Sequence, residues 1–144
     1  MNDNANVKFE EILPTPDAYF KLFNTTGWNS TYRASVDELY EAISRSWFTV
    51  CAYDDADELI GFGRVISDGV LYAIICDMIV EPLFQNMGIG SAMLRRIIRK
   101  CKEGNIRVVW LFSAAGESGF YKRYGFDERP LNAPGMQMKL NIVE

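Results

Sequence analysis

The sequence contains no histidine among its 144 residues. This absence excludes imidazole metal ligands, histidine-dependent catalytic triads and histidine general bases. Acid–base chemistry must therefore use carboxylates, tyrosine, cysteine, lysine or water. The three cysteines, Cys51, Cys76 and Cys101, show no C-x-x-C spacing, so we expect no metal site and interpret them as reduced thiols that pack in apolar surroundings.

Long apolar runs and an excess of positive charge are also missing. No stretch approaches the ~20 residues needed to cross a bilayer, and residues 1–6 are too polar for a secretory signal, so we expect a cytoplasmic protein with no membrane partner. The 15 Lys and Arg residues against 19 Asp and Glu give a net charge of −4, which favours a cationic substrate over nucleic acid. The length fits a single domain over residues 1–144.

Hydrophobic periodicity predicts a mixed sheet with helices on its faces. The expected strands are 7–12, 47–53, 59–66, 70–80, 106–112 and 136–142, and the expected helices are 15–27, 35–43, 90–104 and 117–124. Short turns join the middle strands, which must therefore be antiparallel, whereas one helical crossover makes strands 70–80 and 106–112 parallel. Both of these strands are nearly continuous apolar runs, so we expect them to be buried. The predicted fold class is α/β (α+β), with a mostly antiparallel sheet.

A glycine-bearing loop at residues 85–90, Gln-Asn-Met-Gly-Ile-Gly, lies directly between a buried strand and an amphipathic helix. Gly88 and Gly90 allow the backbone to approach a ligand, and the helix start adds free amides and a positive dipole end. A pyrophosphate fits such a place. Met93 replaces the third glycine of a dinucleotide fingerprint, and no Walker loop occurs. The alternative is a strand-to-helix turn with no ligand.

A second aromatic motif, Phe-Tyr-Lys-Arg-Tyr-Gly-Phe at residues 120–126, follows the strand after the glycine loop. A right-handed crossover brings the start of this short helix to the same end of the sheet as the loop. Tyr121 can then reach a ligand held there. The alternative is a tyrosine that only packs.

Together these motifs carry a resemblance. Residues 77–90, Leu111-Phe112 and residues 120–126 resemble the GNAT superfamily of acetyl-CoA-dependent N-acetyltransferases. Residues 26–28, the turn at 64–69, Asp77 and Gly135-Met136 are similar to the subgroup that contains plant serotonin N-acetyltransferase and its small prokaryotic relatives. The resemblance implies a three-layer fold with a splayed central pair of parallel strands, and acetyl-CoA as the cofactor.

The resemblance also implies positions for the cofactor. The pantetheine arm would pair with the backbone of the first splayed strand, the loop would hold the pyrophosphate, and Tyr121 would stand near the thioester sulfur as a catalytic residue. The implied cofactor-binding residues are Met78, Ile79, Val80, Gln85, Asn86, Met87, Gly88, Ile89, Gly90 and Ser91. Gln85 stands where arginine is commoner in the family. Arg95 or Arg96 can contact the 3′-phosphate, although a solvated basic face is the plainer interpretation.

Acyl transfer to an amine requires the neutral form of the amine. Because most primary amines are protonated near pH 7, a base must remove a proton first. Asp77 is the only carboxylate within the strand 70–80, and we predict it as the general base; the alternative is a structural carboxylate, with a water chain deprotonating the amine. Cys76 in an apolar strand has little thiolate, so direct attack by the amine is preferred to an acyl-cysteine. Trp28 and Tyr32, with Trp47 nearby, are expected on the acceptor side.

The predicted function is transfer of acetyl from acetyl-CoA to the primary amine of a small molecule, of the arylalkylamine or polyamine type. Two alternatives stay open: acetylation of protein lysines or N-termini, and a non-catalytic acyl-CoA sensor or interaction module. The strand expected at 136–142 would leave an exposed edge, which permits a homodimer through strand pairing or exchange.

Overall fold

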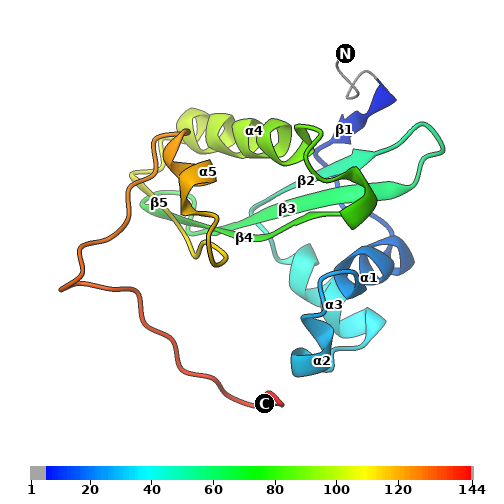
Figure 1. The fold of residues 1–144 in the computed structure, drawn as a ribbon, viewed down its shortest axis with the longest axis horizontal. Helices are drawn as coiled ribbons and strands as arrows, with labels where there is room; N and C mark the ends of the chain where they lie inside the picture. Colours follow the sequence, from blue (N-terminus) through cyan, green and yellow to red (C-terminus); the bar gives the residue numbers. More distant parts are fainter. Residues whose placement is uncertain (1–5, 144) are drawn as a thin grey trace.

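The computed structural model describes residues 6–143, which form one mixed sheet and its covering helices (Figure 1). The elements are β1 (Lys8–Glu10), α1 (Pro16–Asn24), α2 (Asn29–Tyr32), α3 (Val36–Ser44), β2 (Phe48–Tyr53), β3 (Leu59–Ser67), β4 (Tyr72–Val80), the 3₁₀ turn η2 (Pro82–Phe84), α4 (Ile89–Glu103), β5 (Val108–Leu111) and α5 (Ser118–Lys122). The five strands are ordered β1-β2-β3-β4-β5. Neighbours from β1 to β4 are antiparallel and β4–β5 is parallel, so the predicted fold class is confirmed.

The helices cover the two faces of the sheet unequally. Helix α4 buries Met93, Leu94 and Ile97 against β2, β3 and β4 on one face. On the other face α1 and α3 pack Tyr19 and Ile43 into a separate core with residues of β2, β3 and β4. Figure 1 shows α1, α2 and α3 together below the sheet and away from β5. Among the helices of residues 6–143, none is long and apolar enough to cross a membrane.

Capping residues stand at the starts of α1 and α3, where the sequence predicted that helices begin. The Thr15 hydroxyl accepts a hydrogen bond from the Ala18 amide (3.3 Å) just before α1. At the start of α3, Ser35 and Glu38 form a reciprocal capping box, with bonds of 3.1 and 3.4 Å. Each arrangement satisfies amides that the first turn of a helix leaves free.

The two parallel strands separate at one end. Pairing between β4 and β5 runs from Tyr72 opposite Val108 to Ile75 opposite Leu111, whereas β4 continues to Val80. Asp77 has a positive φ of 52°, and the pairing with β3 shifts register across from it. A bulge of this kind bends a strand. The predicted splayed pair is therefore confirmed.

Strand β5 and the strand expected at 136–142 differ from prediction. Val108 and Trp110 are 40% and 37% exposed, because α1–α3 do not extend under β5 and its outer edge has no partner in the described chain. Residues 136–142 belong to no strand, so the prediction of a sheet strand there is wrong. Alternation shows that a segment is able to form a strand, but a strand also needs a free edge within reach.

Candidate active site

The chain turns sharply where β4 passes into α4. Glu81 accepts a hydrogen bond from the Leu83 amide (2.7 Å) and fixes the turn η2. The Gln85 side chain donates to the Val80 carbonyl (3.1 Å). Asn86 and Gly88 then take positive φ angles of 65° and 82°, and α4 begins at Ile89. Glycine adopts this conformation without strain, so Gly88 allows the turn.

This turn leaves a run of backbone amides free. The Ala92 amide donates to the Gly88 carbonyl (3.0 Å). The amides from Asn86 to Ser91 have no acceptor within residues 6–143, and Gly88 provides no side-chain cap. Free amides at a helix start, with the positive end of the helix dipole, form a site for an anion. We call residues 85–91 the glycine corner.

An open strand edge adjoins the glycine corner. Because pairing with β5 ends at Ile75, the backbone from Cys76 to Val80 faces the gap between the splayed strands. The side chain of Met78 lies over Gly63, where a Cβ would come within 2.6 Å of its sulfur. The side chain of Ile79 is buried on the opposite face, among residues of α1 and α3. The edge of β4 can therefore pair with an extended amide-bearing ligand.

Helix α5 lies beside the glycine corner. A Cβ placed on Gly90 would lie 3.9 Å from the Phe120 ring, so the two motifs singled out in the sequence meet. The ring of Tyr121 packs edge-on against Phe120 and Phe126, with centroids 5.0 and 6.0 Å away. Burial is the main cause that raises the pKa of Tyr121, and the Glu117 charge adds to it. Its hydroxyl therefore stays protonated through the neutral range.

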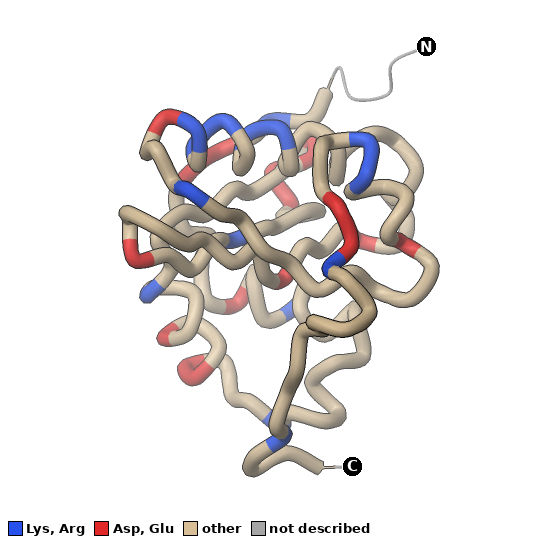
Figure 2. The backbone as a smooth tube through the Cα atoms, turned by 90° about the vertical axis from the view of Figure 1, so that its left-hand side faces the viewer, with Lys and Arg blue, Asp and Glu red and all other residues tan. Residues whose placement is uncertain are grey.

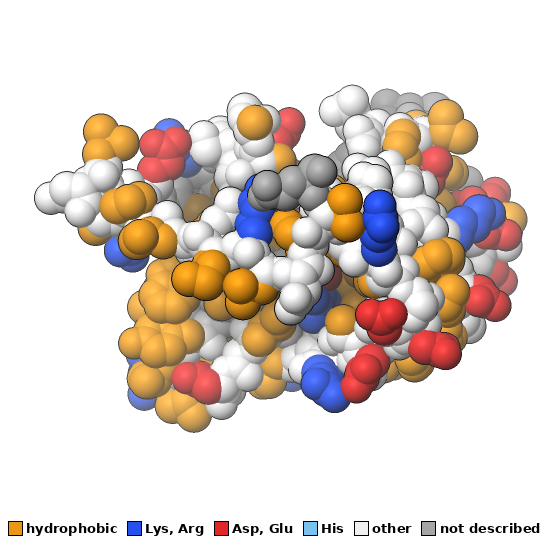
Figure 3. Space-filling model, turned by 90° about the horizontal axis from the view of Figure 1, so that it is seen from below, with side chains coloured by type: hydrophobic (Ala, Val, Ile, Leu, Met, Phe, Trp, Pro, Cys, Tyr) orange, Lys and Arg blue, Asp and Glu red, His pale blue; other side chains and the backbone are white. Residues whose placement is uncertain are grey.

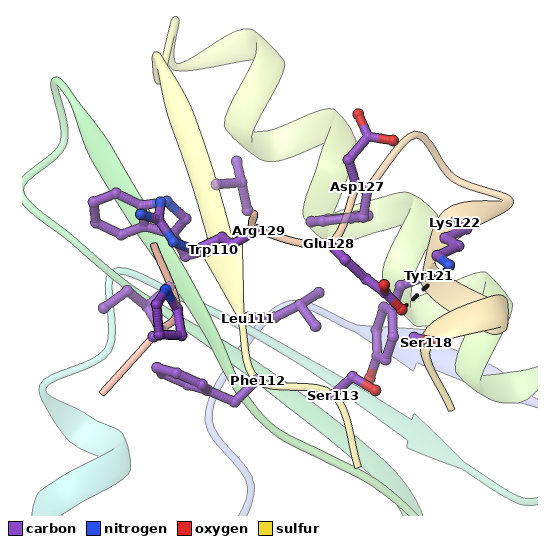
Figure 4. Close-up of a pocket in the computed structure, with 15 residues that line it drawn as sticks. Trp110, Leu111, Phe112, Ser113, Ser118, Tyr121, Lys122, Asp127, Glu128 and Arg129 are labelled. Atoms are coloured by element: carbon purple, nitrogen blue, oxygen red, sulfur yellow. Dashed lines mark ion pairs between the residues drawn. The ribbon is translucent and has the colours of Figure 1, made fainter. Parts of the chain in front are cut away.

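Tyr121 lines a cavity of about 600 Å³ between β5 and the segment after α5. Figure 4 shows its hydroxyl directed toward Ser113, just beyond the end of β5. Leu111 and Phe126 form apolar walls, and an ion pair between Lys122 and Glu128 (3.2 Å) lies at the margin. Ser113 was not predicted, because nothing in the spacing of the sequence marks the residue beyond a short strand.

Asp77 is held by an ion pair. Its carboxylate lies 2.5 Å from Arg64 Nε and 3.5 Å from the Tyr19 hydroxyl, and Arg64 also donates to the Ala42 carbonyl (3.3 Å). Burial and the Asp77 charge both raise the pKa of Tyr19 strongly, so Tyr19 acts only as a neutral hydrogen-bond donor. Asp77 does not line the cavity that contains Tyr121. The contact with Arg64 favours the structural alternative for this carboxylate.

The predicted acceptor residues lie elsewhere. Trp28, just before α2, and Tyr32 of α2 line a second cavity of about 440 Å³ with residues 137–142, and this cavity shares no residue with the first. The structure thus brings these two aromatics together but not next to Tyr121. Trp47 is not with them, because it packs against Gly104 at the end of α4. The short helix α2 was itself unpredicted, since four residues show no apolar stripe.

The basic face of α4 is largely occupied by internal contacts. Arg96 lies 3.5 Å from Glu11 and 5.1 Å from the Phe9 ring centroid, whereas Arg95 points to α5 and donates to the Tyr124 hydroxyl (3.4 Å). Figure 2 shows a row of Lys and Arg positions along the top of the molecule, where α4 lies in Figure 1, while others are scattered lower down. Of the two predicted arginines, Arg95 is the one on the side of α5.

Comparison with known proteins connects this geometry to a family. Residues 45–128 match the model of the acetyltransferase (GNAT) domain. The chain belongs to the GNAT acetyltransferase family. The match includes β2 to α5 and thus the glycine corner, the splayed edge and Tyr121, so it covers both motifs on which the sequence prediction depended. The chain is accordingly an acyltransferase, as predicted.

Individual GNAT relatives agree with this assignment. The chain is 32% identical to the uncharacterized N-acetyltransferase ycf52 of Pyropia yezoensis, over 94% of this chain and 74% of that protein. It is 29% identical to the chloroplastic serotonin N-acetyltransferase 2 of Oryza sativa, over 72% of this chain and 54% of that protein. A probable acetyltransferase from meticillin-resistant Staphylococcus aureus has a solved structure with a TM-score of 0.82 at 28% identity, covering 93% and 99% of the two chains. The matched part of the chain thus spans about three quarters of the length of the ycf52 protein and about half of the length of the serotonin N-acetyltransferase.

Proposed function

We propose that this protein is an acetyl-CoA-dependent N-acetyltransferase that acetylates the primary amine of a small molecule by direct attack. The observation that carries the proposal is the run of free amides from Asn86 to Ser91, next to the unpaired edge of β4. A pyrophosphate supplies anionic acceptors for the amides, and a pantetheine arm supplies amide groups for the edge. These are the two chemical parts of coenzyme A.

The energetics of such a site are favourable without a cationic side chain. Residues 85–91 contain no lysine or arginine, so the anion would be held by backbone amides alone. Charge-assisted hydrogen bonds contribute about 1.5–3 kcal/mol each, and three or four of them approach the ~8 kcal/mol of micromolar binding before ordering costs are subtracted. Gln85, in place of a more usual arginine, is engaged with Val80 and leaves the amides accessible.

In the proposed reaction the amine nitrogen attacks the thioester carbonyl, the C–S bond breaks, and the leaving sulfur accepts a proton. Tyr121 is the proposed donor. A thiol has a pKa near 8.5 and tyrosine about 10, and burial raises the pKa of Tyr121 further, so full proton transfer to the thiolate is uphill by at least about 2 kcal/mol. The hydroxyl of Tyr121 therefore acts mainly by hydrogen bonding to the developing negative charge.

The amine must also lose a proton before it attacks. An alkylamine with a pKa near 10.4 is neutral only about once in several thousand molecules at pH 7, a cost of roughly 4–5 kcal/mol. Asp77 was the predicted base, but proton acceptance there would leave Arg64 without its partner, 2.5 Å away. We therefore propose the second route, in which water carries the proton to solvent and Asp77 positions the bulge of β4.

This assignment predicts that Asp77→Asn and Arg64→Gln behave alike. Asparagine tolerates the left-handed conformation at position 77, so the variant removes the ion pair and keeps the backbone. Each variant should lower the thermal midpoint by several °C, as expected for a loss of about 1–2 kcal/mol, and lower kcat/KM less than about 10-fold. Calorimetry and amine acetylation assays measure both quantities. If Asp77→Asn alone loses more than about 100-fold in kcat, Asp77 is the base.

For the acceptor we propose an arylalkylamine or a polyamine. The net charge of −4 favours a cationic substrate. The exposed rings of Trp28 and Tyr32 could hold an aromatic ring or a cation, but they line a cavity separate from that of Tyr121 and so do not carry this choice. A relative named a serotonin N-acetyltransferase is consistent with an arylalkylamine.

A panel of primary amines, assayed by release of free thiol from acetyl-CoA, tests the proposed function. The panel should contain arylalkylamines, polyamines, lysine-containing peptides and peptides with free N-termini. We expect the highest kcat/KM with one of the first two classes. A clear preference for peptides would favour protein acetylation. Thermal protection by acetyl-CoA without thiol release on any amine would instead indicate a non-catalytic sensor.

A further inference from the structure

The end of β5 directs its side chains alternately to two sides. Figure 4 shows Trp110 and Phe112 on one side of the chain. Leu111 and Ser113 lie on the other side, which faces Tyr121. This alternation is that of a strand. The pairing of β5 with β4 ends at Leu111, so Ser113 lies two residues into the opening between the splayed strands.

The two sides of β5 differ in polarity. Val108, Trp110 and Phe112 are exposed apolar side chains on the side that α1–α3 leave uncovered. Figure 3 shows hydrophobic side chains gathered on the left of the molecule seen from below, the side on which β5 lies in Figure 1. Ser113 is the first polar residue after the apolar run 108–112. Its hydroxyl thus marks the place where the apolar run ends beside Tyr121.

The side chains of Ser113 and Tyr121 meet at one space. Both residues line the cavity of about 600 Å³, and Figure 4 shows the Tyr121 hydroxyl directed toward Ser113. Each hydroxyl carries one hydrogen that it can donate. An acceptor atom placed between the two side chains can therefore receive a hydrogen bond from both.

The Ser113 hydroxyl is able to turn toward that space. It donates to the Ala114 carbonyl (2.8 Å), and the hydrogen of a serine hydroxyl rotates to suit its partner. Ala114 is exposed, so water can replace Ser113 as the donor to this carbonyl. The change costs little, because one hydrogen bond is exchanged for another.

The cationic side chains of the cavity have other partners. Of the described residues that line it, Lys122 and Arg129 are cationic. Lys122 pairs with Glu128 (3.2 Å), and Arg129 Nε donates to the Ala133 carbonyl (2.8 Å). A negative charge that develops beside Tyr121 therefore depends on neutral donors. Hydroxyl groups aimed at such a charge stabilise it well where water is excluded.

We propose that Ser113 is a second catalytic hydroxyl, which donates a hydrogen bond to the leaving sulfur together with Tyr121. This role rests on the proposed function, because it takes the sulfur of the thioester to lie beside Tyr121. When the C–S bond breaks, its electron pair stays on the sulfur, and the two hydroxyls stabilise the negative charge that develops there. Ser113 keeps its own proton. Because full proton transfer from Tyr121 is uphill, the second hydrogen bond lowers the energy of the thiolate that leaves.

The thiol of bound coenzyme A tests this contact without any turnover. Hydrogen-bond donors stabilise the thiolate, so the removal of one donor raises the pKa of the thiol. Ser113→Ala should raise that pKa by about 1 unit relative to the wild type, as expected for one hydrogen bond to a charged group. Tyr121→Phe should raise it as well. The absorbance of the thiolate follows the titration, after calorimetry has established saturation with coenzyme A.

Two further variants control for a merely structural effect. Ser113→Thr keeps a hydroxyl on the same carbon atom and should keep the thiol pKa of the wild type. Ser118→Ala removes a hydroxyl that lines the same cavity at the start of α5, and it should leave the thiol pKa unchanged. In amine acetylation, Ser113→Ala should lower kcat about 10-fold and keep KM for the amine within about 3-fold. Ser113→Thr should restore kcat.

These measurements separate the role of Ser113 from the proposed function. An equal thiol pKa in the wild type and in Ser113→Ala, with coenzyme A bound to both, overturns the role of Ser113 and leaves the proposed function standing. A shift in Ser118→Ala as large as that in Ser113→Ala also overturns it, since the effect would then not belong to one hydroxyl. A wild type that binds no coenzyme A overturns both.

Discussion

Tyr121→Phe should lower kcat by about 10²-fold, or about 2.7 kcal/mol of transition-state free energy, and leave the affinity for acetyl-CoA nearly unchanged. The variant removes only the hydroxyl. The ring contacts with Phe120 and Phe126 stay in place, and the glycine corner is untouched. An effect on kcat without an effect on binding is the mark of an interaction made mainly in the transition state.

Tyr124→Phe is the matched control for this prediction. Tyr124 lies just beyond α5, packs against Phe120 and accepts a hydrogen bond from Arg95 (3.4 Å), but it does not line the cavity with Tyr121. It should keep kcat within about 3-fold of the wild type. If Tyr121→Phe keeps wild-type turnover under conditions where chemistry limits the rate, Tyr121 does not serve the leaving group.

The pH dependence gives a further check on Tyr121. Burial raises its pKa above the usual value of about 10, so the protonated form is fully present below that pH and is lost only above it. In the wild type, kcat should therefore not fall on the alkaline side before about pH 10. A fall centred near pH 8 would assign the proton donor to another group.

Gly88→Val should weaken binding of coenzyme A by about 10²-fold or more. Gly88 has a φ of 82°, which a β-branched residue adopts only with strain, so the turn must change and the free amides must turn away from a common centre. Loss of two charge-assisted hydrogen bonds, each contributing about 1.5–3 kcal/mol, gives a loss of that size or greater. Titration calorimetry with coenzyme A measures the change.

Gly69→Val is the matched control for Gly88→Val. Gly69 has a φ of 77° in the turn between β3 and β4, so the substitution imposes the same backbone strain outside the glycine corner. Both variants should lose similar thermal stability, but only Gly88→Val should lose affinity for coenzyme A. Equal losses of affinity would show that the effect at Gly88 comes from general destabilisation.

Local features of the site were predictable from the sequence. The glycine corner depends on a strand, a turn with positive φ and a helix start that follow one another within about a dozen residues, and the capping residues Ser35 and Glu38 act within one turn. The short distance in sequence makes such features recognisable. The position of Tyr121 at the same end of the sheet followed from the handedness of one crossover.

Features that depend on distant contacts were less predictable. The ion pair between Arg64 and Asp77 forms because a bulge in β4 redirects Asp77, and no spacing in the sequence marks that bulge. Trp47 is an aromatic residue of the kind expected on the acceptor side, but its ring packs against Gly104 at the end of α4. Residues 136–142 alternate as a strand does, yet a strand forms only where a free edge is within reach, and this segment belongs to no strand of residues 6–143.

The most direct test of the central claim is a titration of the ¹⁵N-labelled protein with coenzyme A, followed by amide chemical shifts. The largest shifts should fall on the free amides from Asn86 to Ser91 and on the β4 edge from Met78 to Val80, which together form the proposed binding surface. If the shifts at saturation fall on other residues, or if none occur, coenzyme A is not bound by the glycine corner and the proposed acetyl transfer there is wrong.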